Sequence, residues 1–153
     1  MRSNPAAGRA ACEEIARTCA LFNLRKVSRA VSQIYEGLIG PSGITGPQFS
    51  ALVAMSTRDE WTLTRLAEAL TVDRTTMTRN LALMEKEGLV AIAAGPDRRE
   101  RVISVTPKGR DSLARALPLW RRAQGRLARA LGAQRLRRLV KILASASESL
   151  AGE

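Results

Sequence analysis

Six polar side chains fall within seven consecutive positions near the middle of the chain. They comprise three short hydroxyls, one amide and two guanidiniums: Arg74, Thr75, Thr76, Thr78, Arg79 and Asn80. At the N-terminal end of a helix, such groups can hydrogen-bond to base edges in a DNA major groove. An ordinary amphipathic helix with a solvated polar face would use the same residue types. The stretch therefore predicts a DNA-reading helix, with a solvated surface as the alternative.

Individual roles within this stretch follow from side-chain chemistry. Arg79 is the candidate for reading a guanine, because a guanidinium can donate two hydrogen bonds to one guanine edge. Thr76 is the candidate for contacting a thymine methyl group. Met77 faces the opposite way by helical spacing, so we expect it in the core.

The two cysteines are the other chemically reactive residues. Cys12 and Cys19 lie seven positions apart, about 10 Å along a helix, so a disulfide between them would require a break in that helix. The simpler interpretation is two small packing residues on an apolar face. The alternative is a redox-sensing thiol, since nearby Arg17, Arg25 and Lys26 are positioned in sequence to favour a thiolate.

Composition excludes several kinds of chemistry. The chain has no His, which removes His-based acid–base catalysis, His-paired nucleophiles and most zinc sites. An enzyme acting on nucleic acid is disfavoured further, because paired carboxylates at a metal-like spacing are lacking. We therefore expect no enzymatic activity, no cofactor and no metal. The net charge of +11 instead favours a polyanionic partner, either a specific DNA site or, as an alternative, DNA bound through charge alone in the manner of a nucleoid protein.

The size and the apolar content predict one globular domain. The chain has 153 residues, of which 45% are hydrophobic. It contains no run of about 18 apolar residues, so no membrane span or membrane partner is expected. The first residues also lack a continuous apolar segment typical of a secretion signal, and we expect a cytoplasmic protein.

The six polar residues belong to the second of two short helices that the apolar spacing predicts between positions 62 and 90. Thr62 is placed to cap the first helix and Asp73 the second, because their side-chain oxygens can accept hydrogen bonds from the free N–H groups. The two residues before Asp73 interrupt the spacing, and Gly88 ends the second helix. The positions expected to face inward are Leu63, Leu66, Ala67, Leu70, Leu81, Met84 and Leu89.

After Gly88 the apolar spacing changes from 3.6 to 2. Residues 89–93 and 101–105 are predicted to form two short strands, joined by a charged turn at 95–100. A β-hairpin directly after a helical hairpin predicts a winged helix. The fold class is thus mostly α with a small β-hairpin wing. The wing carries three cations, Arg98, Arg99 and Arg101. For Arg98 and Arg101, a phosphate contact and a solvated charge are the alternatives.

The helix before the hairpin follows a loop at residues 40–43. Thr45 and Gln48 form a capping box that opens it, with Phe49, Leu52, Val53 and Met55 expected inside. Before the loop, residues 12–40 follow a helical pattern whose apolar stripe changes phase near Asn23, so Asn23 is expected to cap a new helix. Residues 1–10 are expected to be disordered or loosely attached.

Two further helices are predicted after the wing. Thr106 and Pro107 open a helix of about 25 residues, which Pro118 should bend, and Gly132 breaks it before a last helix over 136–150. The predicted seam of the 25-residue helix consists of Leu113, Leu117, Trp120, Gln124, Leu127 and Leu131. A seam this long exceeds what a small winged-helix core can cover, so we expect a homodimer. A helical bundle closing on itself is the alternative.

This order of elements resembles the MarR family of bacterial transcription regulators, over about residues 20–150. The matching motifs are LAEAL at 66–70, VDRTTMTR at 72–79, EKEGLV at 85–90, DRRERV at 97–102 and SVTPKG at 104–109. Each motif is short, and the resemblance rests on their occurring together in this order.

The resemblance implies a single domain over residues 1–153. Residues 12–40 and 107–150 would build a homodimer, and residues 45–105 a winged helix-turn-helix region that binds an inverted-repeat operator in double-stranded DNA. It also implies that Arg99 enters the minor groove and that Asp97 helps to orient it. Output is expected to be repression.

Family members often release DNA when they bind a small aromatic or lipophilic effector, or when a cysteine is oxidised. The family's pocket usually lies where dimer helices meet the winged region. Large side chains available for such a pocket, with core packing as their alternative role, are Tyr35, Phe49, Met55, Trp61 and Trp120. Arg25 or Arg29 would hold a ligand carboxylate or phosphate. The cysteines lie outside the general family pattern, so the resemblance assigns them no role.

Overall fold

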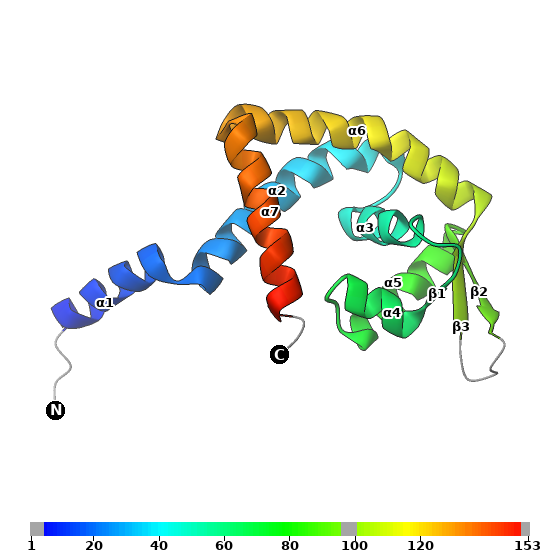
Figure 1. Ribbon diagram of the computed structural model, residues 1–153, viewed down its shortest axis with the longest axis horizontal. Helices are drawn as coiled ribbons and strands as arrows, with labels where there is room; N and C mark the ends of the chain where they lie inside the picture. The colour runs from blue at the N-terminus through cyan, green and yellow to red at the C-terminus, as the bar shows by residue number, and fades with distance from the viewer. Residues whose placement is uncertain (1–4, 96–100, 151–153) are drawn as a thin grey trace. The chain divides into compact units, whose positions relative to one another are not determined.

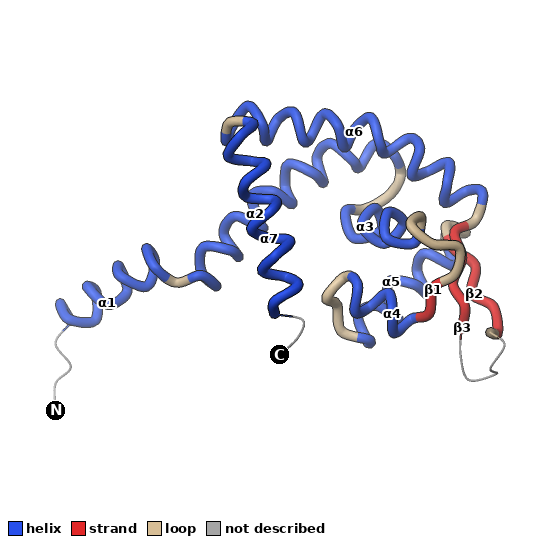
Figure 2. The backbone as a smooth tube through the Cα atoms, in the orientation of Figure 1, coloured by secondary structure: helices blue, strands red, loops and turns tan. Residues whose placement is uncertain are grey.

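The computed structural model describes residues 5–95 and 101–150, and it is dominated by helices (Figure 1, Figure 2). The chain divides into a first unit that ends at Ile34 and a second that begins at Tyr35. The fold class matches the prediction, because a small antiparallel sheet accompanies the helices. Within the described residues, no helix is long and apolar enough to cross a membrane.

The first unit contains α1 (Pro5–Thr18) and most of α2 (Ala20–Ile39). Helix begins at Pro5, so disorder is wrong as an expectation for residues 5–10, whereas their loose attachment stays a prediction; residues 1–4 lie outside the described residues. The break falls at Cys19 rather than at Asn23. Asn23 does not cap a new helix: its Nδ2 donates to the carbonyl oxygens of Ala16 (3.2 Å) and Cys19 (2.9 Å), and its backbone N–H also donates to Cys19 O at 3.1 Å.

The second unit continues through a 3₁₀ turn (Gly40–Ser42) into α3 (Gly46–Met55). The predicted capping box is present, since Thr45 N donates to Gln48 Oε1 at 2.8 Å and Gln48 N to Thr45 Oγ1 at 3.4 Å. Val53 was expected inside but is 41% exposed, because it lies at the edge of the buried face of α3.

The winged elements follow in chain order. They are β1 (Trp61–Thr62), α4 (Leu63–Ala69), α5 (Arg74–Lys86), β2 (Val90–Ala94) and β3 (Arg101–Val105). The sheet order is β1-β3-β2, all antiparallel, and Ile103 pairs with both Trp61 and Ile92. The two hairpin strands were predicted, whereas β1 was not, because two residues are too few to show a period of 2.

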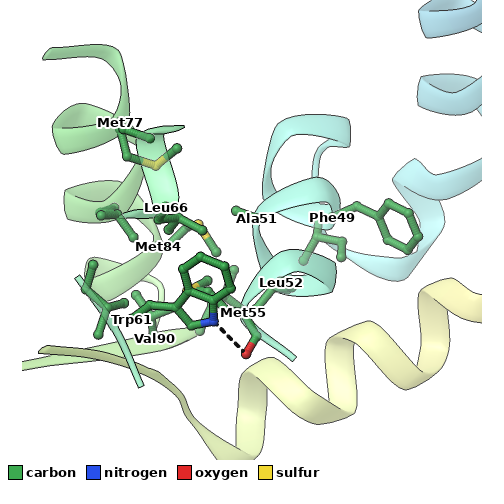
Figure 3. Packing of buried hydrophobic residues seen from close by; sticks show 14 of the residues in the cluster. Phe49, Ala51, Leu52, Met55, Trp61, Leu66, Met77, Met84 and Val90 are labelled. Atoms are coloured by element: carbon green, nitrogen blue, oxygen red, sulfur yellow. Dashed lines mark hydrogen bonds between the residues drawn. The ribbon is translucent and has the colours of Figure 1, made fainter. Parts of the chain in front are cut away.

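The core joins α3, α4, α5 and the sheet. Leu52, Leu66 and Met84 are fully buried there, and the Trp61 indole donates its Nε1 hydrogen to Met55 O at 3.3 Å (Figure 3). This hydrogen bond gives the buried indole the partner that its N–H requires. The helix α5, which the sequence predicts to read DNA, therefore lies on a packed support.

The chain ends in α6 (Pro107–Leu131) and α7 (Ala133–Leu150). The helix α6 continues through Pro118, and its buried line combines small residues such as Ala116 and Ala123 with Leu127 of the predicted seam. Leu117 and Leu131 of that seam are 38% and 39% exposed. Small side chains on the inner face let a helix approach its neighbours closely, and this leaves the larger ones outside.

Candidate nucleic-acid interface

The N-terminal ends of α4 and α5 are held by the predicted caps. Arg65 N donates to Thr62 Oγ1 at 3.3 Å. At the start of α5, Thr76 donates twice to Asp73: its N–H to Oδ1 at 2.8 Å and its hydroxyl to Oδ2 at 2.6 Å. These hydrogen bonds lower the pKa of the Asp73 carboxyl, since they stabilise its charged form. Thr71, at φ 51°, takes the left-handed conformation that turns the chain between the helices.

The two faces of α5 differ as predicted. Met77, Leu81 and Met84 are buried against the core. Five of the six polar candidates are exposed on the opposite face: Arg74, Thr75, Thr76, Thr78 and Arg79. The sixth, Asn80, is half-buried. This surface combines hydrogen-bonding groups with two fixed positive charges, as base and phosphate recognition requires.

Two threonine hydroxyls on this face already donate within the chain. Thr78 Oγ1 donates to Arg74 O at 2.7 Å, and Thr76 Oγ1 donates to Asp73. Each can still accept a hydrogen bond and offer its methyl group. The contact of Thr76 with a thymine methyl and the reading of a guanine by Arg79 stay predictions.

The C-terminal end of α5 is tied to α3 and α6. Gln48 Nε2 donates to Glu87 Oε2 at 2.6 Å, and Lys108 Nζ donates to Glu87 O at 2.7 Å. Thr106 Oγ1 donates to Gly88 O at 2.6 Å. Both ends of α5 are therefore fixed, which limits the ordering that binding would require.

Gly109 sits at the joint between the winged elements and α6. It is buried, and a Cβ at this position would overlap the carbonyl oxygen of Leu89 and crowd Cγ1 of Val105. Only a residue without a side chain allows the first turn of α6 to approach the backbone after α5 this closely. The SVTPKG motif is thus a packing joint as well as a cap.

A hollow of about 670 Å³ separates α5 from α4 and the strands. It is lined by three guanidiniums from three elements, those of Arg65, Arg74 and Arg101, together with the carboxylates of Glu68 and Glu85. Arg65 is a surface residue that the sequence reasoning missed. Its signal was an arginine in the first turn of α4, on the face that does not join the core.

The rest of the wing lies outside the described residues. That segment includes Asp97, Arg98 and Arg99, and their roles stay predictions from the sequence. Arg101 is described: it is exposed at the start of β3 and paired in register with Ala94. The strands thus place one wing cation beside the reading helix.

Five of the seven predicted effector-pocket residues pack in or against the core of this chain. Phe49, Met55 and Trp61 are buried core side chains. Tyr35 and Trp120 pack partly buried against the same core, and burial raises the pKa of the Tyr35 hydroxyl. The remaining two candidates, Arg25 and Arg29, are exposed on α2 in the first unit. A shared effector pocket stays a prediction.

Both cysteines have free thiols. Cys12 is exposed on α1, and Cys19 is half-buried at the break between α1 and α2. The interpretation of both as packing residues is not met within this chain, because Cys12 and its neighbour Ile15 are exposed. Within the described residues, no group of acidic, Cys or His side chains could hold a metal ion.

A capped helical hairpin with an exposed polar second helix, followed by a β-hairpin, defines a winged helix-turn-helix protein. A MarR family model matches residues 42–100 of the chain. The structure is similar to that of the Mycobacterium tuberculosis transcriptional regulator MosR in complex with DNA, with 40% identity and a TM-score of 0.75 over 86% of this chain and 98% of that one. The chain belongs to the MarR family.

Two further similarities agree with this assignment. The transcriptional repressor CouR, bound to a 23-mer DNA duplex, has 27% identity and a TM-score of 0.80, over 87% of this chain and 95% of that one. The organic hydroperoxide resistance transcriptional regulator of Bacillus subtilis is 33% identical over 89 residues. That match spans 58% of this chain and 60% of the Bacillus protein.

Proposed function

We propose that the protein is a sequence-specific DNA-binding transcriptional regulator, a repressor, that binds an inverted-repeat operator as a homodimer and releases it on binding a small aromatic or lipophilic effector. One observation carries the DNA-binding part: the polar face of α5 is exposed while both ends of the helix are fixed. Arg74 and Arg79 stand on that face as donors for base edges and phosphates. The DNA in the solved complexes of MosR and CouR supports the same assignment.

Exposed apolar side chains support the homodimer. The helix α7 buries none of its residues within the chain, and Val140 and Ile142 are 52% and 64% exposed. In the first unit, Ile15 and Phe22 are likewise about half exposed. Apolar surface of this extent on amphipathic helices is typical of an interface. A second copy of the chain would cover it and would place two α5 helices about one DNA turn apart.

The domain division follows from this arrangement. Residues 45–105 would read DNA, and the helices within 12–40 and 107–150 would hold the dimer. An effector would act by favouring a spacing of the two α5 helices that does not match the operator, which requires a preference of a few kcal/mol. Arg99 would enter the minor groove with Asp97 beside it, and Arg98 would contact a phosphate.

A gel-shift titration against the upstream region of the chain's own gene, with random competitor DNA, tests the proposal. We expect one protected inverted repeat and a specificity ratio of about a thousandfold or more. A ratio near one would make the protein a charge-only DNA binder and overturn the proposal. Arg99→Ala should weaken operator binding strongly while the dimer stays intact in sedimentation, and unchanged affinity would remove the wing from the mechanism.

A thiol-based redox regulator is the second candidate function. It is favoured by the exposure of Cys12 and by the similarity to a regulator named for hydroperoxide resistance. We expect an organic hydroperoxide to release operator DNA from the protein but not from the Cys12→Ser, Cys19→Ser variant. If both proteins respond alike, the thiols are not the sensor, and a thermal-shift screen of aromatic acids would then identify an effector through its stabilisation of the native dimer.

A further inference from the structure

The positive charge of the chain is concentrated after the winged elements. Residues 107–150 contain eleven Lys or Arg side chains but only two acidic ones, Asp111 and Glu148. Residues 45–105 contain eight of each sign. The excess that a DNA reader would be expected to carry on its reading surface therefore lies on α6 and α7.

Four of these arginines surround one hollow in the second unit. The hollow has a volume of about 350 Å³ and is lined by Arg121, Arg122, Arg126 and Arg129 together with Gly125 and Leu38. We refer to it as the arginine hollow. Its volume is at the lower end of the range for small-molecule sites. Its walls are cations, and its apolar contribution comes from Leu38 of α2.

Among the described residues, the four guanidiniums have no carboxylate neighbour in ion-pairing range. Across residues 5–95 and 101–150, the one salt bridge joins Arg9 to Glu13 in α1. Arg122 and Arg126 are four positions apart and Arg126 and Arg129 three, spacings at which like charges destabilise a helix. A bound anion would convert this repulsion into attraction.

Gly125 is a second, independent feature of the same place. A glycine within a helix costs about 1 kcal/mol relative to alanine. A Cβ here would meet no backbone, and its nearest neighbour would be Nη1 of Arg129 at 3.6 Å. No steric conflict therefore requires the glycine. Its effect is to keep open the floor of the arginine hollow.

We propose that the arginine hollow binds a small anion carrying two adjacent phosphates. Guanidinium groups bind phosphate oxygens through paired, charge-assisted hydrogen bonds, and four of them match the charge of a diphosphate better than that of a single phosphate. A concave site of this size fits a compact anion. The proposal does not depend on the regulator function, because binding is read directly, without operator DNA.

The placement favours a small anion over duplex DNA. The helix α3 contacts both α5 and α6 and lies between them in Figure 1, so the hollow is not on the reading face of α5. A duplex that followed α5 would not enter it. The chemistry recognised here is a diphosphate, whether free or as part of a nucleotide-like molecule.

Calorimetric titration of the intact protein with inorganic pyrophosphate tests the proposal, with EDTA present and inorganic monophosphate as the comparison ligand. We expect saturable pyrophosphate binding at one site per chain, at least about tenfold tighter than monophosphate. The double variant Arg122→Gln, Arg126→Gln should weaken it about tenfold or more. Gly125→Leu, which leaves every charge in place, should weaken it similarly by filling the floor.

The matched control is Arg135→Gln with Arg138→Gln, which removes the same charge from exposed positions of α7. We expect it to change pyrophosphate affinity less than about twofold, apart from general screening. Equal losses in both double variants would indicate diffuse charge and overturn the proposal. The proposal would also be overturned if the protein did not bind pyrophosphate and the Arg122, Arg126 variant bound a random 24-base-pair duplex more weakly. That result would make these arginines DNA contacts. All variants replace exposed side chains or one helical glycine, and unliganded melting curves verify their folding.

Discussion

The winged elements and the two C-terminal helices differ in their charge and in how much of their apolar surface is buried within the chain. Residues 45–105 balance their charges, cap their helices and bury a core around Leu52, Leu66 and Met84. Residues 107–150 are strongly cationic, and α7 buries nothing within the chain. The first region holds most of the buried core, whereas the second exposes apolar and cationic side chains.

The comparison changes the meaning of the net charge. A value of +11 favours a polyanion partner, but it does not describe the surface that carries the reading helix. That surface holds a few cations at defined positions: Arg74 and Arg79 on α5, with Arg65 and Arg101 beside it. Specific recognition depends on where donors are held, while total charge governs encounter and non-specific affinity.

The joint between the two regions should show the largest effect of a single substitution. Gly109→Val would force a side chain into the carbonyl oxygen of Leu89 and against Val105. We expect a loss of more than about 3 kcal/mol in the free energy of unfolding, or failure to fold. Urea denaturation followed by circular dichroism measures it.

Two glycine controls separate this overlap from ordinary effects of helix and turn. Gly88, at φ 72°, has room for a Cβ, so Gly88→Ala should cost about 1 kcal/mol through backbone strain alone. Gly125→Ala lies in an open part of α6 and should stabilise by about 1 kcal/mol. Similar losses at Gly109 and Gly88 would mean that the joint is not a tight contact.

Disrupting the apolar face of α7 should have the next largest effect, and it should spare the winged core. Val140→Glu with Leu143→Glu would place two charges where a second copy of the chain would pack. We expect dimer affinity to fall by about a hundredfold or more, because buried unpaired charges are costly. Sedimentation velocity measures it. Ser147→Glu, exposed on the same helix, is the control, and a variant that remains dimeric would remove α7 from the interface.

Local chemistry explains why the winged region was predictable from sequence. The start of a helix can be predicted from one capping side chain and its neighbours, as at Thr45, Thr62, Asp73 and Thr106. The strand at 101–105 shows its period of 2 within five residues. Such signals do not depend on what packs against the element, so both their positions and their types were correct.

Other features depended on contacts that no local pattern contains. The break at Cys19 was placed four residues too late, because the Asn23 side chain donates to the carbonyl oxygens of Ala16 and Cys19 rather than capping a new helix. The buried line of α6 uses Ala116 and Ala123, which a search for large apolar residues passes over. Arg65 joined the candidate interface only once the hollow between three elements was known. In each case, tertiary proximity decided the outcome.

A pair of arginines should then separate specific from general electrostatics. Arg79→Ala, on the reading face, should weaken operator binding by about 1–3 kcal/mol and relax base preference at one position of each half-site. Arg137→Ala, on α7, should weaken operator and random DNA equally and only slightly. Fluorescence anisotropy on both duplexes at two salt concentrations measures this. Equal effects of the two substitutions on specificity would mean that α5 does not read bases.

The smallest effect concerns the cap that starts the reading helix. The pKa of Asp73 is lowered by hydrogen bonds from Thr76, so the folded state holds the charged carboxylate more strongly than the unfolded chain does. A lowered pKa contributes stability that is present above the unfolded value, near pH 4, and is lost as the pH falls through the folded value. Asp73→Asn keeps a capping oxygen but cannot titrate.

We therefore expect the difference in melting temperature between the two proteins to be constant from pH 7 to 5 and to shrink below about pH 4. Because Asp73 is exposed, solvent screens its charge and the change should be small. Thermal melts from pH 7 to 3 measure it, with Asp111→Asn on α6 as the comparison. A difference in melting temperature that stays constant down to pH 3 would show that the cap acts through its hydrogen-bond geometry alone. The charge of Asp73 would then contribute nothing to the stability of the winged region.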